Sequence, residues 1–244
     1  MKATQFEFRF RVLIAATIYV IGFWAPWTRY VAAAPPTTAW LALSATMANW
    51  GWLPLDQATI AVTLLAIFSA CAGAALRIWG SAYLGTSIVQ SSTMHAGQMI
   101  ASGPFRFVRN PLYLGTWLFS LGVAILMPPT GALFFLAANV LFYIRLILAE
   151  EAYLALELGP AYLEYTQRVP RLLPSLRPRI SAAMARPHWL QGVMGEIYPA
   201  GFAVCMAILA WRYNPHILIR CVLLCFGMSL LVRAFLPGPQ LSAD

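Results

Sequence analysis

Charged side chains are scarce in this sequence. Only 10% of its 244 residues are Asp, Glu, Lys or Arg, and Lys2 is the only lysine. Soluble domains carry about 25% charged residues. The sequence is instead 61% hydrophobic, with a mean hydropathy of +0.71. This composition excludes an ordinary soluble domain. It predicts an all-α, polytopic membrane protein, because apolar segments of about 20 residues recur and each is long enough to cross a hydrocarbon core of about 30 Å.

Cysteine and histidine are also few, with four and three residues respectively. All four cysteines lie in apolar segments, where a thiol behaves as a small apolar group. Cys221 and Cys225 are spaced to share a helix face, but no histidine or carboxylate lies near them in the sequence. We therefore predict no metal site. The net charge of +8 comes almost wholly from arginines that flank the apolar runs. It predicts contact with anionic membrane lipids rather than with nucleic acid.

Six apolar runs are long enough to be predicted as membrane spans. A seventh apolar segment, 39–53, is shorter, is interrupted by Asn49, Gly51 and Pro54, and carries three tryptophans. We expect this segment to lie at the interface, where tryptophan is enriched. The six predicted spans cover residues 12–31, 58–79, 112–127, 131–148, 193–211 and 217–236.

The arginine distribution predicts the orientation of these spans. Lys2, Arg9 and Arg11 precede the first span, and five arginines fall within 150–190. Because positive charge is retained in the cytoplasm, both termini and the loops 80–111 and 149–192 are expected there. The Pro-Pro-Thr-Gly turn at 128–131 closes a central helical hairpin with both ends at that face. We expect an integral protein of the bacterial inner (cytoplasmic) membrane, with a cofactor pocket that faces the cytoplasm.

Two polar motifs flank the central hairpin. The first reads GPFRFVRNPLYLG at 103–115. The second comprises Glu150-Glu151, LGPAYLEY at 158–165, and VPR at 169–171 followed by Pro174. Together the motifs resemble the isoprenylcysteine carboxyl methyltransferase and phospholipid methyltransferase superfamily over residues 87–176. Phe105 stands where that superfamily has tyrosine, and Asn110 where it has histidine. With the predicted spans, we expect three segments: 1–80 with the N-terminal transmembrane helices and the interfacial segment, 81–190 as the methyltransferase-like core, and 191–244 as a C-terminal transmembrane hairpin.

The resemblance implies that S-adenosylmethionine is the cofactor. Phe105 is expected to pack on the adenine, and Glu150 to hold the polar end of the cofactor. Asn110, Pro111, Leu112 and Tyr113 are expected to form the pocket floor. The remaining implied contacts are Gln90 near the adenosyl group and the backbone run Gly97, Gln98, Met99 and Ile100.

The acceptor is less closely specified. Prenylcysteine enzymes place an arginine four residues before the cofactor glutamate, but here that position is Leu146 and the nearest arginine is Arg145. Arg145 is the candidate partner of a substrate carboxylate, and His95 the candidate base for an amine. The apolar hairpin predicts a lipid or lipid-modified acceptor. The alternatives are phospholipid amine N-methylation, an NADPH-dependent reductase of the sterol type, and a non-catalytic scaffold or transporter. The Glu-Glu and Val-Pro-Arg motifs favour methyl transfer over reduction.

Overall fold

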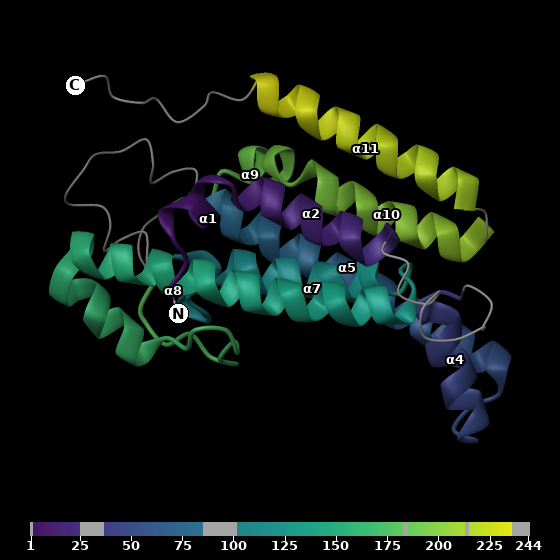
Figure 1. Cartoon of the computed structure of the whole chain (residues 1–244). Coiled ribbons are helices and arrows are strands. Elements are labelled where there is room, and N and C mark those ends of the chain that lie inside the picture. Colours follow the sequence, from purple (N-terminus) through teal and green to yellow (C-terminus); the bar gives the residue numbers. More distant parts are fainter. Residues whose placement is uncertain (1, 25–36, 85–101, 183–184, 213–214, 236–244) are drawn as a thin grey trace. The chain divides into compact units, whose positions relative to one another are not determined.

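The computed structural model describes residues 2–24, 37–84, 102–182, 185–212 and 215–235 (Figure 1). Within these ranges the regular structure is entirely helical, and no strand occurs. The all-α class expected from the sequence is therefore confirmed. The helices are α1 Gln5–Arg9, α2 Arg11–Trp24, α4 Ala39–Asn49, α5 Leu55–Leu84, the 3₁₀ turn η1 Gly103–Arg106, α7 Pro111–Ala124, α8 Pro129–Arg168, α9 Trp189–Gly195, α10 Ile197–Arg212 and α11 Pro215–Phe235.

Local sequence signals mark where several of these helices begin. Proline occupies the first position of α7, α8 and α11, where its missing N–H costs nothing and its fixed φ suits a helix. Helix α1 begins with a capping box. The Thr4 hydroxyl accepts from the Glu7 amide, and the Glu7 carboxylate accepts from the Thr4 amide. Thr38 caps α4 in the same way, by accepting from the Leu41 amide. These starts are set by neighbouring residues alone.

The chain divides into two compact units, each discontinuous in sequence. The first unit comprises Met1–Ala70 and Trp117–Tyr153, and the second comprises Cys71–Thr116 and Leu154–Asp244. Residues of the long helices α5 and α8 are divided between the two units: 55–70 and 129–153 belong to the first, and 71–84 and 154–168 to the second. The three sequence segments 1–80, 81–190 and 191–244 stay a prediction.

In the first unit, α2 packs closely against α8. A Cβ at Gly131 would overlap the Gly22 carbonyl oxygen, so the two backbones touch at this pair. Phe135 is fully buried beside this contact and meets the Tyr19 ring edge-on, with 4.6 Å between ring centroids. The backbone amide of Ala39 donates to the Met127 carbonyl at 2.7 Å, which ties the start of α4 to the hairpin turn. Small residues thus allow close helix packing, as is common between membrane helices.

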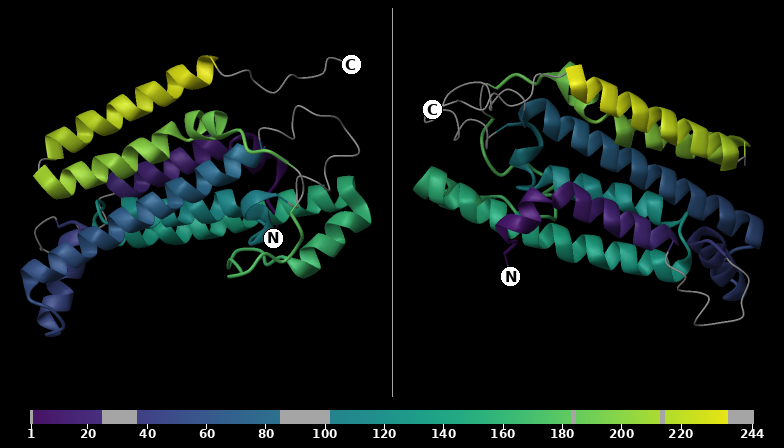
Figure 2. Two further views of the ribbon diagram at one scale, coloured as in Figure 1. Left: turned by 180° about the vertical axis from the view of Figure 1, so that it is seen from behind. Right: turned by 45° about the horizontal axis from the view of Figure 1, so that its top comes forward.

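The second unit has two packed regions. Helices α10 and α11 lie side by side and antiparallel (Figure 1, Figure 2). A Cβ at Gly201 on α10 would overlap Cys225 on α11, so this glycine is what lets the helices approach. The other region is a small core formed by Tyr162, Tyr165 and Val169 at the end of α8. Helix α8 is broken just before this core at Gly159, where φ is +56°, and Pro160 follows directly.

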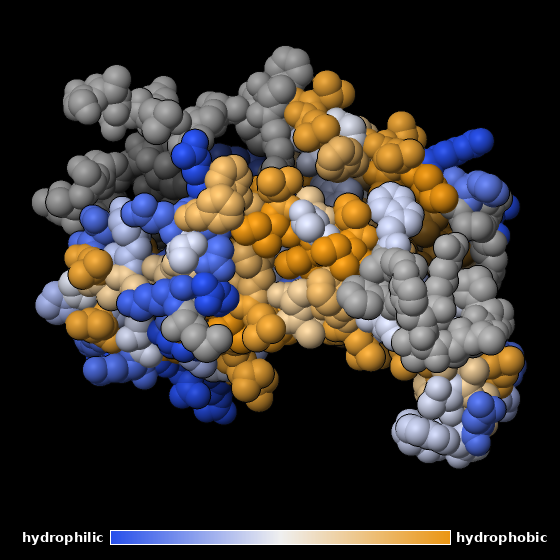
Figure 3. All heavy atoms as spheres, in the orientation of Figure 1, coloured by the Kyte–Doolittle hydropathy of each residue, from blue (hydrophilic) through white to orange (hydrophobic). Residues whose placement is uncertain are grey.

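The structure supports the prediction that this protein has helices able to cross a membrane. Among the described residues two helices are long and apolar enough to cross a membrane, α5 and α8. A third is added if α9 and α10, bent by 68° at their junction, count as one broken span. Shorter apolar helices occupy Arg11–Trp24, Pro111–Ala124 and His216–Val232. Apolar side chains gather on the outer faces of the helices (Figure 3), as expected for contact with lipid. The count of six spans stays a prediction.

Helix α4 is short and helix α8 is long in comparison with the apolar segments of the sequence. Helix α4 has 11 residues, or about 16 Å at 1.5 Å per residue, which is too short to cross a membrane. Helix α8, by contrast, extends well beyond residue 148, where the fourth predicted span ends. It continues through Glu150 and Glu151 because the following residues, rich in Ala, Leu and Glu, are strong helix formers. The helix is interrupted only where Gly159 and Pro160 break it.

Candidate active site

The predicted site residues fall into three groups. Phe105, Asn110, Pro111, Leu112 and Tyr113 belong to the second unit, and Arg145 and Glu150 to the first. The others lie outside the described residues: Gln90, His95, Gly97, Gln98, Met99 and Ile100.

The first motif begins with a turn that only glycine accommodates. Gly103 has a φ of +52°, in the left-handed region that L side chains disfavour. A Cβ at this position would also overlap the ring of Tyr83 on α5. Pro104 follows, buried, in the first turn of η1. The turn therefore holds Phe105 at a fixed distance from the end of α5.

Hydrogen bonds join this turn to the second motif. The Tyr165 hydroxyl donates to the Phe105 carbonyl at 2.9 Å. The Arg109 amide donates to the Pro170 carbonyl, also at 2.9 Å. Within the second unit these bonds connect the first motif to residues 165–170 of the second motif. The proximity of residues 105–115 to residues 145–151, which the central hairpin predicts, stays a prediction.

A second set of bonds extends the junction along the chain after α8. The amide of Ser175 donates to the Phe107 carbonyl at 3.0 Å. Its hydroxyl lies 3.2 Å from the same carbonyl and 2.7 Å from the Arg177 carbonyl, either of which can accept its one hydrogen. The Arg179 amide donates to the Arg106 carbonyl at 3.0 Å. The Nε of Arg106 in turn donates to the Ile180 carbonyl at 3.0 Å. Arg106 is thus an anchor for the segment that follows α8, a role that its position in the sequence did not reveal.

Asn110 lies directly before α7 and is buried. Its side-chain Nδ2 donates to the Arg171 carbonyl at 3.2 Å, and its backbone carbonyl accepts from the Leu114 amide. Arg171 belongs to the Val-Pro-Arg part of the second motif. Asparagine here supplies a donor, as a histidine at this position also can, so the departure from the motif keeps its hydrogen-bonding capacity.

Arg77 is a further residue at this site that the motif analysis missed. It lies on α5, and its Nη1 donates to the Thr116 hydroxyl and to the Leu112 carbonyl. Leu112 is one of the residues expected to form the pocket floor. An arginine in an otherwise apolar helix was the sequence signal that could have identified it.

In the first unit, Arg145 binds a carboxylate from within the chain. Its Nε and Nη2 donate to the two carboxylate oxygens of Glu7, at 2.9 and 2.8 Å. The hydrogen bonds from Arg145 and from the Thr4 backbone lower the pKa of Glu7 to about 2. Leu146, at the position where prenylcysteine enzymes carry arginine, is buried. Glu150 is half-buried within α8.

Comparison with known proteins identifies the central part of the chain. The family model described as phospholipid methyltransferase matches residues 57–160. The match covers less than half of the chain, and it is to this central part that the similarity applies. Neither the search of curated proteins nor the search of solved structures returned a match.

The family is part of the isoprenylcysteine carboxyl and phospholipid methyltransferase superfamily, so the resemblance inferred from the two motifs is confirmed. With the apolar helices, it indicates an integral membrane protein and a methyltransferase. The family match includes α5 from residue 57 onward, the whole first motif and α8 up to Pro160. It ends at the break in α8, so Tyr165 and Arg171 lie beyond it.

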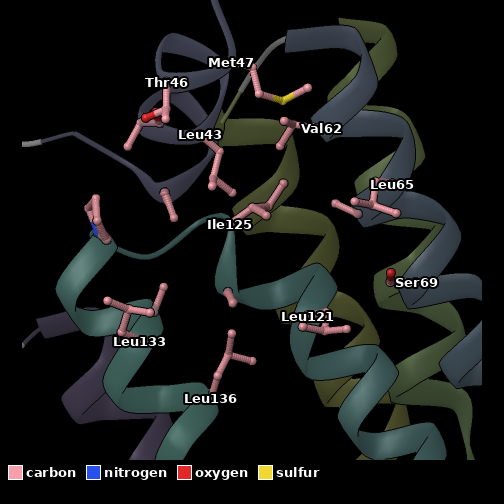
Figure 4. Close-up of a pocket in the computed structure, with 16 residues that line it drawn as sticks. Leu43, Thr46, Met47, Val62, Leu65, Ser69, Leu121, Ile125, Leu133 and Leu136 are labelled. Carbon is pink, nitrogen blue, oxygen red and sulfur yellow. The ribbon is translucent and has the colours of Figure 1, made fainter. Parts of the chain in front are cut away.

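The first unit contains a cavity of about 560 Å³. Figure 4 shows side chains from α4, α5, α7 and α8 surrounding it, among them Leu43, Val62, Leu121 and Leu133. Of its lining residues only Thr46 and Ser69 carry a polar side chain. None of the predicted site residues lines it. Such a surface does not suit a charged cofactor, because buried charges need partners.

Three aromatic residues of the central hairpin do not line this cavity. Phe119, Phe135 and Phe142 are buried in the core of the first unit. Aliphatic side chains line the open cavity instead. Among the residues that the structure describes, no three His, Cys, Asp or Glu side chains gather as metal ligands do.

Proposed function

We propose that this protein transfers a methyl group from S-adenosylmethionine to a lipophilic acceptor in the membrane. The observation that carries the proposal is the family match over residues 57–160, which includes the complete first motif. The hydrogen-bonded junction between the two motifs supports it, because it holds the first motif in a defined conformation.

The first motif fits the methyl donor chemically. The Phe105 ring is partly exposed although its backbone is fixed, so it offers a flat apolar face to an adenine. Residues 110–113 form the adjoining start of α7, with Tyr113 also partly exposed. When bound, S-adenosylmethionine supplies a methyl group already activated on a positively charged sulfur. Glu150 stays the proposed partner of its polar end, and Gln90 and residues 97–100 its other proposed contacts.

Because the donor is activated, the protein has to position the acceptor and exclude water. A carboxylate acceptor is ionised at neutral pH and needs no base. An amine acceptor has to lose a proton, and His95 is the proposed group that takes it. Arg145 is the proposed partner of a carboxylate. Its bidentate contact with Glu7 is the geometry by which arginine recognises that group.

Two acceptor classes follow. An enzyme similar to the isoprenylcysteine carboxyl methyltransferases methylates a lipid-linked carboxylate, and Arg145 favours this class. A phospholipid N-methyltransferase methylates an amine headgroup, and the description of the matching family favours that class. We propose the cytoplasmic face of the inner membrane as the location, on the basis of the arginine distribution.

Binding of S-adenosylhomocysteine to the purified full-length protein tests the proposal. We expect saturable binding in a calorimetric titration, and no binding of NADPH under the same conditions. NADPH binding without S-adenosylhomocysteine binding would overturn methyl transfer in favour of a sterol-type reductase.

The acceptor class is tested by methyl transfer to two series of acceptors with increasing chain length, prenylated thio-acids and amine lipids. We expect the rate to rise with length in one series, since each buried CH₂ contributes about 0.8 kcal/mol. Activity that does not depend on chain length in either series would mean that the acceptor arrives from water.

A further inference from the structure

An ion pair in the second unit joins the matched family region to a part of the chain beyond it. Nε and Nη2 of Arg77 donate to the two carboxylate oxygens of Glu196, at 2.7 and 3.0 Å. The Ser81 hydroxyl donates to the same carboxylate at 2.8 Å. The Glu196 side chain is only 8% exposed, and the residue occupies the junction between α9 and α10. Helix α9 lies outside the family match, and the residue that follows it is a buried glutamate hydrogen-bonded to two side chains of α5.

The other edge of the same guanidinium faces the first motif. Nη1 of Arg77 donates to the Thr116 hydroxyl and lies 3.5 Å from the Leu112 carbonyl. The Thr116 hydroxyl also donates to the Leu112 carbonyl, at 2.9 Å. Arg77 thus holds Glu196 with one edge and the first turn of α7 with the other.

Close backbone approaches bring these elements within reach of one another. A Cβ at Gly115 on α7 would come within 2.7 Å of Arg77 Cγ and 2.8 Å of the Gly73 carbonyl oxygen on α5. A Cβ at Gly192 on α9 would come within 2.9 Å of the α5 backbone, at Ile78 and Ala82. Any larger residue at either position would separate the helices and stretch the contacts of Arg77.

We propose that Glu196 is a positioning residue for the methyl-donor site: through Arg77 it fixes the first turn of α7, where residues 111–113 of the pocket floor lie. The proposal rests on the function proposed above. It implies that α9 and the start of α10 contribute to binding of the methyl donor, although they lie beyond the family match.

The charge of Glu196 is what sets the direction of Arg77. A guanidinium in an apolar helix needs a counter-ion, and those found inside membrane proteins are almost always paired. When Glu196 loses its charge, Arg77 turns toward any other acceptor or toward the lipid headgroups. The Leu112 carbonyl and the Thr116 hydroxyl then lose their shared donor, and the first turn of α7 becomes free to move.

The test compares Glu196→Gln with wild type in the full-length protein, by titration with S-adenosylhomocysteine and by amide hydrogen exchange. Glu164→Gln is the control, because Glu164 pairs with Arg168 in the same unit but both side chains are more than half exposed. We expect Glu196→Gln to weaken binding about tenfold, the effect of one lost charge-assisted contact. We also expect faster exchange at residues 111–116. Glu164→Gln should change neither.

The double variant Arg77→Met/Glu196→Met separates positioning from folding. It leaves no uncompensated charge, so it is less harmful to folding than either single change, yet it also lacks the donor to Leu112. We expect the same loss of affinity as for Glu196→Gln. Wild-type affinity in either folded variant would overturn the proposal, and failure of both to fold would mean that the pair maintains the whole unit instead. Absence of binding by the wild type would overturn the proposed function and, with it, this role of Glu196.

Discussion

Two arginine–glutamate pairs, one in each unit, have nearly the same geometry and different surroundings. Arg145 and Glu7 in the first unit, like Arg77 and Glu196 in the second, share two hydrogen bonds between 2.7 and 3.0 Å. Glu7 is 22% exposed, however, and Glu196 is 8% exposed. Glu7 lies in the five-residue helix α1, whereas Arg77 also reaches the first turn of α7. The contacts around an ion pair, rather than its own geometry, therefore determine which other parts of the structure it stabilises.

The largest expected effect comes from Glu196→Gln. Breaking a buried pair leaves a buried charge without a partner, which costs about 3 kcal/mol at the lower end of the usual range. We expect that loss in the free energy of unfolding, measured by denaturant titration in detergent micelles. Glu7→Gln should lower the free energy of unfolding by clearly less, because Glu7 is more exposed to solvent than Glu196. Equal losses in the two variants would contradict the distinction between the pairs.

Two glycines with a left-handed backbone, one in each unit, differ in how closely their surroundings pack. Gly103 and Gly51 both have positive φ, but a Cβ at Gly103 would overlap Tyr83, whereas a Cβ at Gly51 meets nothing within 4 Å. Alanine at either position incurs a backbone cost of about 1–2 kcal/mol. Gly103→Ala adds a steric cost, so we expect it to be more destabilising than Gly51→Ala by about 2 kcal/mol. Matched unfolding titrations of the two variants measure this difference, and equal values would show that the Tyr83 contact does not constrain the turn.

Tyr165→Phe removes a side-chain hydrogen bond that links the second motif to the Phe105 carbonyl. We expect a loss of about 1 kcal/mol in unfolding free energy. We also expect weaker binding of S-adenosylhomocysteine, because the backbone of Phe105 is then held less firmly. Full stability together with unchanged affinity would mean that the Phe105 backbone is held without this bond.

The smallest expected effect is the pH dependence of the Glu7–Arg145 pair. The pKa of Glu7 is lowered from 4.5 to about 2, chiefly by Arg145, so the folded protein favours the ionised carboxylate. The stabilisation is complete above roughly pH 5 and is lost as the pH falls toward 2, because the unfolded chain takes up the proton first. The difference in melting temperature between wild type and Glu7→Gln should shrink over this range. A difference independent of pH would show that the charge of Glu7 contributes nothing.

Much of the fold follows from patterns that are local in the sequence. The turn at 128–131, the short helix before Gly51 and the start of α7 at Pro111 lie where proline, glycine and apolar length place them. Helix α8 extends beyond residue 148, where the fourth predicted span ends. Glutamate is a good helix former, and α8 continues to Gly159, where the backbone leaves the helical region.

Part of the candidate site could also be predicted from the sequence, and part could not. The first motif could be located from the sequence because its glycines, prolines and arginines occur within thirteen consecutive residues. The contacts that hold it could not. Tyr165 lies 60 residues from Phe105, and Asn110 lies 61 residues from Arg171. No periodicity connects positions so far apart, and the carbonyl groups that accept these bonds are present in every residue.

The sequence by itself determined the helical class, the membrane character and the family of residues 57–160, because apolar length, helix breakers and a compact motif are properties of consecutive residues. Only the tertiary structure decided which charges meet. Arg77 and Glu196 are 119 residues apart, and Glu7 and Arg145 are 138 apart. Their pairing depends on helix packing that glycines such as Gly115 and Gly131 permit. A buried charge has to find its partner in space, and the distance between the two along the chain plays no part in that choice.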